Sequence, residues 1–223
     1  MENLNPRDHL EFLKRLLDEK IIVVGPLTKL KDGSMSPIYV NLRDKMWDSH
    51  GLIPMFGVLF ATLISELISE RRRTPNYVCG IPEAANPLAT AAVYAGQGMG
   101  MDLRLRALRP EPKNYGIGSG SLVIGNYEEG GHLYLIDDVV TTSKSKREAS
   151  KKLITGGYPQ DEITVLVAFD RQQGGMESLR RDGFRTGSLF RILDVAQTFA
   201  EEHLITEEQH ADVQRFIAEH QQS

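Results

Sequence analysis

Residues 132–145 read HLYLIDDVVTTSKS. The stretch begins with a run of apolar side chains typical of a buried strand, continues with the adjacent acids Asp137 and Asp138, and ends in a loop rich in hydroxyl groups. A helix is predicted directly after this loop, over 146–154. A strand, a short polar loop and a helix in this order form the repeating unit of a parallel sheet covered by helices.

The same alternation continues through the chain. Strand-like runs at 77–82, 102–108 and 162–170 are each followed by a helical pattern. We therefore expect an α/β protein with a central, mostly parallel sheet flanked by helices. Ligands of such sheets bind beyond the carboxyl ends of the strands, so the polar loops at that edge are the place to look for a site.

Other elements are predicted outside this alternation. Apolar residues at helical spacing predict helices over 8–19 and 53–68 and one or two further helices within 192–217. Residues 38–42 alternate in polarity like a strand. These elements add to the sheet and do not change the fold class.

The composition fits one domain in a single compact unit. The chain has 223 residues and a net charge of −4, which gives no field that would attract nucleic acid. Cys79 is its only cysteine, so an intrachain disulfide is excluded. No targeting segment is recognised, and no apolar run near the roughly 20 residues of a membrane span. We therefore expect a cytoplasmic protein without a membrane or nucleic-acid partner.

The loop that follows Asp138 predicts a site for a phosphate group. It presents backbone N–H groups, hydroxyls and the positive end of a helix to one point, which suits a phosphate monoester. Asp137 and Asp138 precede it and can accept hydrogen bonds from a pair of vicinal hydroxyls. The pattern therefore indicates a ribose 5-phosphate site. An ordinary turn with capping residues is the alternative, but capping does not explain two carboxylates in a row after an apolar strand.

These residues resemble the phosphoribosyl diphosphate (PRPP) binding motif of type I phosphoribosyltransferases, and the chain is similar to the orotate phosphoribosyltransferases in particular. The likeness covers nearly the whole chain in five motifs that follow the order of the family. Besides 132–145, they are KDGSMSPIYVNLR at 31–43, VCGIP at 78–82 with PLAT at 87–90, RPEPKNYG at 109–116 and DRQQGG at 170–175. The resemblance implies the type I phosphoribosyltransferase fold in one domain, 1–223, with an N-terminal hood and base-side region over about 1–45 and a core over about 46–223.

The resemblance also implies a reaction. The 5-phosphoribosyl group of PRPP would pass to orotate, giving orotidine 5′-monophosphate and pyrophosphate in pyrimidine (UMP) biosynthesis. Magnesium would be held mainly by PRPP, without direct side-chain ligands from the protein. The family further implies a homodimer, in which the loop around Lys113 closes over the neighbouring subunit's site.

Positions that match the family motifs imply the site residues. Lys113 and Arg109 would stabilise the leaving pyrophosphate and, with Asp138, form the catalytic set. Orotate would be held by Lys31, Thr141 and Arg171, with Arg171 at the orotate carboxylate. The residues expected to bind PRPP are Lys31, Asp137, Asp138, Val139, Val140, Thr141, Thr142, Ser143, Lys144, Ser145, Arg109, Lys113 and Tyr115.

Three positions depart from the family pattern and leave two other functions open. Pro110 stands where a lysine is usual, Glu83 lies beside the expected diphosphate, and Ser143 replaces a glycine of the phosphate loop. One alternative is a transferase for a different base, against which Arg171 and Lys31 argue because a neutral base needs no carboxylate clamp. The other is a non-catalytic relative that binds PRPP or a nucleotide and releases no pyrophosphate.

Overall fold

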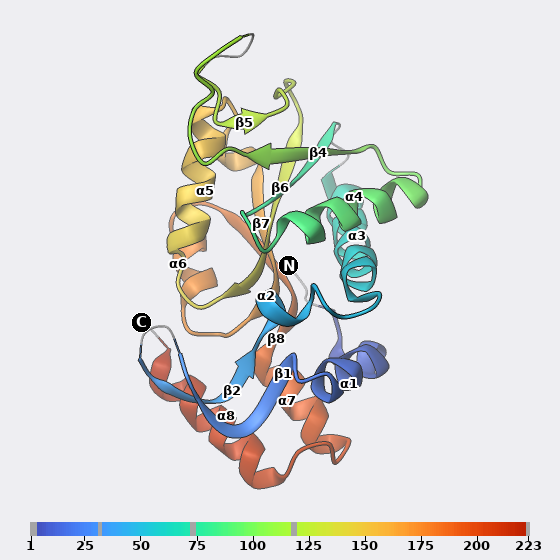
Figure 1. Ribbon diagram of the computed structural model, residues 1–223, viewed down its shortest axis with the longest axis vertical. Helices are drawn as coiled ribbons and strands as arrows, with labels where there is room; N and C mark the ends of the chain where they lie inside the picture. The colour runs from blue at the N-terminus through green and yellow to red at the C-terminus, as the bar shows by residue number, and fades with distance from the viewer. Residues whose placement is uncertain (1–3, 31–32, 72–74, 117–119, 222–223) are drawn as a thin grey trace.

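The structure, a computed structural model, describes residues 4–30, 33–71, 75–116 and 120–221. Its central strands are β3 (Asn76–Gly80), β4 (Leu103–Leu108), β5 (Val123–Ile124), β6 (His132–Val140), β7 (Ile163–Asp170) and β8 (Arg185–Arg191). They form one sheet in the order β5-β4-β3-β6-β7-β8 (Figure 1). Neighbouring strands are parallel, except that β5 runs antiparallel to β4. The predicted α/β class with a mostly parallel sheet is confirmed.

Helices cover both faces of this sheet. On one face lie α3 (Leu52–Arg71) and α4 (Asn86–Gly98), and on the other lie α5 (Lys144–Thr155) and α6 (Gly175–Arg181) (Figure 1). The helices predicted over 53–68 and 146–154 are therefore present and extend slightly beyond the predicted bounds.

The central strand β6 shows why helices pack on both faces. Leu133 and Leu135 pack with α5 and α6 in one hydrophobic cluster, whereas Tyr134 and Ile136 pack with α3 and α4 in the other. Successive side chains of a strand point to opposite faces, so a strand covered on both sides is apolar along its whole length. This is the apolar run that precedes the acid pair in the sequence.

A second, antiparallel pair of strands forms a hairpin from β1 (Ile22–Lys29) and β2 (Met35–Val40). Its second strand corresponds to the one predicted at 38–42, shifted toward the N-terminus, whereas β1 is not among the predicted strands. The C-terminal helix α8 (Glu207–His220) packs against β2 and lies with the hairpin at one end of the molecule (Figure 1). The remaining elements are η1 (Pro6–His9), α1 (Leu10–Asp18), α2 (Leu42–Lys45), η2 (Gln160–Glu162) and α7 (Ile192–Glu201).

The predicted division of the chain at about residue 45 remains a prediction. The hairpin falls inside the predicted hood region, but its partner α8 comes from the other end of the chain. Any hood therefore includes C-terminal as well as N-terminal residues.

Helix α3 is long and strongly apolar. Its residues Leu52–Ser69 have a mean hydropathy of 1.9 and, by length and composition alone, could cross a membrane. The expectation that no such run exists is wrong on these criteria. Half of the segment is buried inside the protein, and α3 approaches α4 so closely that a Cβ at Gly57 would lie 2.6 Å from the Cβ of Ala91. This packing accounts for its apolar character as a core helix.

Candidate active site

A cavity of about 430 Å³ lies between the β1–β2 hairpin and the ends of β6 and β7. It is found at the carboxyl edge of the parallel strands, where ligands of such sheets bind. Its lining residues are Lys29, Leu30, Tyr39, Val40, Asn41, Arg43, Asp44, Asp138, Val139, Thr141, Thr142 and Arg171. The predicted residues at the ends of β6 and β7 therefore share one cavity with side chains of the hairpin and of the segment that follows it.

Asp138 is the acid of the pair that faces this cavity. Its Oδ1 atom accepts a hydrogen bond of 2.7 Å from the backbone N–H of Val139, which fixes the direction of the carboxylate. Its Oδ2 atom lies 3.6 Å from the guanidinium of Arg43. The Asp138 side chain is 11% exposed. Asp138 therefore presents one carboxylate oxygen to the cavity, beside a cation.

Asp137 lies behind Asp138 and is not one of the residues that line the cavity. Its Oδ2 atom is 2.7 Å from the ammonium of Lys146, and both side chains are almost fully buried. Its Oδ1 atom accepts the backbone N–H of Asp138 at 2.9 Å. Burial raises the pKa of Asp137 to about 6, against the attraction of Lys146, which lowers it. The two adjacent acids thus have different surroundings.

The hydroxyl-rich loop runs from β6 into α5, as the sequence predicts. The first turn of α5 contains Lys144, Lys146 and Arg147 but no acidic residue. Cations are unfavourable at the positive end of a helix dipole, so this arrangement suits an anion held at the same point. Thr142, Lys144 and Ser145 are exposed there.

Ser143 occupies the position where the family has a glycine, and the structure accommodates its side chain. Its φ is −82°, which any residue adopts, and its Oγ atom donates to Ser178 of α6 at 3.4 Å. The side chain is buried against α6. This departure therefore introduces neither backbone strain nor a side chain into the exposed part of the loop.

The loop after β7 packs directly on the phosphate loop. A Cβ at Gly175 would lie 2.7 Å from the carbonyl oxygen of Thr141, so a side chain there would displace the backbone. Arg171 comes from the same segment and is buried. Its Nη2 atom donates to Ser36 Oγ at 3.1 Å and to the carbonyl oxygen of Ile38 at 3.2 Å. The hairpin thus orients the guanidinium that lines the cavity.

The cations of the predicted catalytic loop lie elsewhere. Arg109 and Lys113 follow β4 and are not among the residues that line the cavity of their own chain. The described part of the loop lies at the opposite end of the molecule from the β1–β2 hairpin (Figure 1). Lys152 of α5 donates to the carbonyl oxygens of Arg109 and Pro110 at 2.9 and 3.0 Å, and the Lys113 ammonium lies 5.3 Å from the centre of the exposed Tyr115 ring.

Other predicted residues are also absent from the lining of this cavity: Val140, Ser143, Lys144, Ser145 and Tyr115. Val140 is fully buried in the cluster that contains α5 and α6. Lys31 lies outside the residues that the structure describes, so its predicted contacts with orotate and PRPP remain predictions. Arg43 and Lys146, by contrast, are charged residues at the site that were given no role from the sequence.

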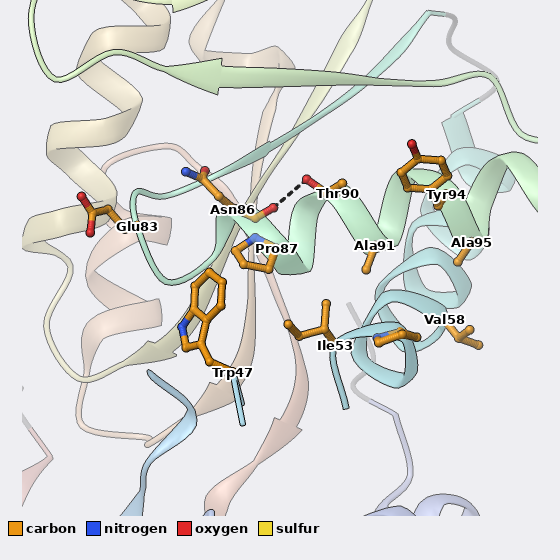
Figure 2. A pocket seen from close by; sticks show the side chains of 11 residues that line it. Trp47, Ile53, Val58, Glu83, Asn86, Pro87, Thr90, Ala91, Tyr94 and Ala95 are labelled. Atoms are coloured by element: carbon orange, nitrogen blue, oxygen red, sulfur yellow. Dashed lines mark hydrogen bonds between the residues drawn. The ribbon is translucent and has the colours of Figure 1, made fainter. Parts of the chain in front are cut away.

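Two further depressions adjoin the site, one smaller and one larger than the cavity. A pocket of about 310 Å³ contains Arg43, Trp47, Pro82, Glu83 and Ala84, and it shares Arg43 with the cavity. Trp47 and Glu83 in turn border an apolar groove of about 890 Å³. Figure 2 shows this groove between α3 and α4, with Trp47 at one end and the exposed Tyr94 toward the other.

The described residues offer no dedicated metal cage. Within 4–30, 33–71, 75–116 and 120–221, no group of three or more His, Cys, Asp or Glu side chains is placed to bind a metal ion. The cavity contributes the carboxylates of Asp44 and Asp138 together with the cations Lys29 and Arg43. Such a donor set fits a magnesium ion that arrives on substrate phosphates, because Mg²⁺ is commonly bound through one or two carboxylates and phosphate oxygens.

Comparisons with known proteins agree on one family. No protein-family model matches the chain. The chain is 30% identical over 173 residues to the orotate phosphoribosyltransferase of Nostoc, with 77% of this chain and 78% of that protein covered. It is 29% identical over 215 residues to an orotate phosphoribosyltransferase of Caenorhabditis elegans, covering 96% of this chain and 88% of the relative.

Solved structures give the same result for the fold. The orotate phosphoribosyltransferase of Francisella tularensis matches with a TM-score of 0.73 over 95% of this chain and 96% of its own, at 16% identity. The UMP synthase of Leishmania donovani matches with a TM-score of 0.72 and 26% identity over 94% of this chain. The match covers 42% of that longer chain, so this chain corresponds to only part of it.

Proposed function

The chain belongs to the orotate phosphoribosyltransferase family, and we propose that it transfers the 5-phosphoribosyl group of PRPP to orotate, giving orotidine 5′-monophosphate and pyrophosphate for pyrimidine biosynthesis. One observation carries the proposal. A single cavity joins the carboxylate of Asp138, the hydroxyl loop at Thr141 and Thr142, and the guanidinium of Arg171. These groups match the ribose hydroxyls, the 5′-phosphate and the orotate carboxylate, respectively.

The arrangement supports a reaction governed by position and charge. As the bond between C1 and the leaving oxygen breaks, positive charge grows on the ribose and negative charge on the pyrophosphate. Asp138 would hold the ribose hydroxyls, while the loop Thr141–Ser145 would hold the 5′-phosphate at the start of α5. Fixed groups of this kind lower the barrier because they need no reorganisation during the reaction.

Orotate would lie on the hairpin side of the cavity. Arg171 lines that side and is already oriented by Ser36 and Ile38 of β2. A guanidinium can bind a carboxylate through two parallel hydrogen bonds, which gives both affinity and orientation. The base nitrogen that attacks C1 would thereby be directed toward the ribose.

We propose that magnesium accompanies PRPP. The ion would neutralise charge on the diphosphate, and Asp138 and Asp44 are the carboxylates of the cavity that could contact it or its water shell. The cations Lys29 and Arg43 lie in the same cavity and would balance the remaining phosphate charge.

We propose a homodimer in which the loop of one subunit completes the site of the other. Two features support this arrangement. Arg109 and Lys113 do not line the cavity of their own chain, and an apolar groove beside the cavity exposes Trp47 by 58% and Tyr94 by 73% (Figure 2). Large exposed aromatic side chains around a groove are typical of an interface. A second copy of the chain would cover this face.

The cytoplasmic location stays a proposal. A net charge of −4 and a buried, unpaired Cys79 are compatible with a reducing compartment without nucleic-acid binding.

Arg171→Ala is expected to weaken orotate binding selectively. Loss of hydrogen bonds to a charged group corresponds to about a 10- to 100-fold rise in KM for orotate, with KM for PRPP changed much less. Steady-state kinetics with each substrate varied in turn would measure both constants. Arg171→Lys is the matched variant, because it keeps the charge but loses the planar pair of donors. An equal rise in both KM values would point to general damage and contradict the assignment.

A panel of bases separates this proposal from the two alternatives left open by the sequence. The protein, PRPP and magnesium are incubated with orotate, uracil or hypoxanthine, and released pyrophosphate is measured. We expect release with orotate alone. Release only with another base would indicate a different transferase, and PRPP binding without release from any base would indicate a non-catalytic relative.

A further inference from the structure

Asp137 and Lys146 form an ion pair in the interior, directly behind the acid that faces the cavity. The Lys146 ammonium is 2.7 Å from Asp137 Oδ2, and the two side chains are only 3% and 5% exposed. Neither residue lines the cavity. The pair therefore acts on a substrate only through the residues that it holds.

Each member of the pair also holds one backbone group of the site. Lys146 donates a hydrogen bond of 2.6 Å to the carbonyl oxygen of Val139. Asp137 Oδ1 accepts the backbone N–H of Asp138 at 2.9 Å. The connection thus runs from the first turn of α5 back to the last residues of β6, and it spans the loop at Thr141–Ser143 that lies between them.

We propose that Lys146 is a positioning residue of the phosphoribosyl site, which fixes the peptide groups of Asp138 and Val139 so that the Asp138 carboxylate and the hydroxyl loop hold PRPP together. This inference rests on the proposed function. It assigns the two adjacent acids different roles. Asp138 contacts the ribose, whereas Asp137 pairs with Lys146 and accepts the backbone N–H of Asp138.

The geometry explains why an ion pair occupies this position. The pair ties the start of α5 to the last residues of β6, on either side of the loop. A buried ion pair is often no better for stability than apolar residues of similar volume, so its presence beside a site favours a role in fixing geometry. Charge is also balanced locally, because Lys146 faces Asp137, and Arg43 faces Asp138.

The test compares the binding of magnesium–PRPP by three variants with that of the wild type. Lys146→Met removes the cation and leaves a buried carboxylate, so it can lower stability as well. The double variant Lys146→Met/Asp137→Asn removes both charges and is expected to fold with a thermal midpoint near that of the wild type. Lys151→Met is the matched control, because Lys151 is an exposed lysine of the same helix.

We expect the double variant to bind magnesium–PRPP about tenfold or more weakly than the wild type by calorimetry, because the hydrogen bond from Lys146 to the Val139 carbonyl oxygen and the ion pair that holds Asp137 are both lost. Lys151→Met is expected to bind normally. A double variant with wild-type affinity would show that the pair only balances charge and would overturn the inference. A double variant that fails to fold would overturn it as well, since the pair would then serve the fold itself.

Steady-state kinetics gives a second readout that a structural role would not change. The double variant is expected to raise KM for PRPP about tenfold or more and to leave KM for orotate nearly unchanged, because Arg171 is oriented by the hairpin and not by the pair. An equal rise in both KM values would contradict the inference.

The outcomes also distinguish this inference from the proposed function. Normal turnover of orotate by the wild type, together with an unchanged affinity in the double variant, would refute the role of Lys146 and leave the function standing. A wild-type protein that binds no PRPP would refute both.

Discussion

Asp138→Asn is expected to lower PRPP affinity and turnover together. The amide keeps the size of the side chain but loses the charge that accepts hydrogen bonds from the ribose hydroxyls and faces Arg43. Loss of a charged hydrogen bond corresponds to about a 10- to 100-fold weaker affinity. We expect a further loss in kcat, because the carboxylate also stabilises the positive charge that develops on the ribose.

Calorimetry with magnesium–PRPP and steady-state kinetics would measure the two effects of this substitution. Asp161→Asn is the matched control, because Asp161 is an exposed acid of η2 and does not line the cavity. A variant at Asp138 that binds PRPP with normal affinity would contradict the ribose assignment.

Lys113→Ala is expected to reduce the rate and to spare binding. The ammonium is needed most when negative charge develops on the leaving pyrophosphate, so its loss should act mainly on kcat. Removal of one such stabilising group costs about 100- to 1,000-fold in kcat. The affinity for PRPP, measured by calorimetry, should change little. Unchanged turnover would remove Lys113 from the mechanism.

A mixture of the two variants tests whether the loop serves the neighbouring subunit. In a hybrid of Asp138→Asn and Lys113→Ala subunits, one site carries both defects and the other carries neither. Random assortment of a two-fold dimer therefore restores about a quarter of the wild-type turnover per site. If each loop served its own subunit, every site in the mixture would keep one defect and no activity would return.

The sequence predicts the parts of the fold that depend on local pattern. The apolar run at 132–140 and the helix at 53–68 follow from periodicity alone, and both are present. The strand β8 was not predicted, because Thr186, Gly187 and Ser188 interrupt its apolar pattern. It forms through pairing with β7, which is a tertiary interaction that no short window reveals.

The same holds for the site: contacts within one motif can be predicted from the sequence, whereas contacts between separate elements cannot. Asp138, Thr141 and Thr142 lie within one motif, so their meeting in the cavity follows from the strand and loop pattern. Asp137 and Asp138 have different surroundings because the side chain of Lys146 points from α5 into the interior and pairs with Asp137. The first turn of α5 consists entirely of polar residues. Such a run is typical of an exposed helix start, so the pattern gives no sign that Lys146 is buried.

The phosphate loop illustrates how a departure from a motif is absorbed. From the sequence alone, Ser143 favours a non-catalytic relative, because side chains in such loops can collide with the ligand. In the structure the hydroxyl contacts Ser178 and the φ is ordinary. The decisive factor is the hydroxyl of Ser178 on α6, a residue more than thirty positions further along the chain.

The most direct test of the proposed function is a single reaction that contains the protein, orotate, PRPP and magnesium. The loss of orotate absorbance and the release of pyrophosphate are followed together, with Asp138→Asn as the comparison. We predict that the wild type consumes orotate and releases pyrophosphate in equal amounts, and that both signals fall together in the variant. Two results would contradict the assignment of this cavity as an orotate phosphoribosyltransferase site. One is pyrophosphate release without orotate consumption, and the other is a wild-type protein that neither consumes orotate nor releases pyrophosphate.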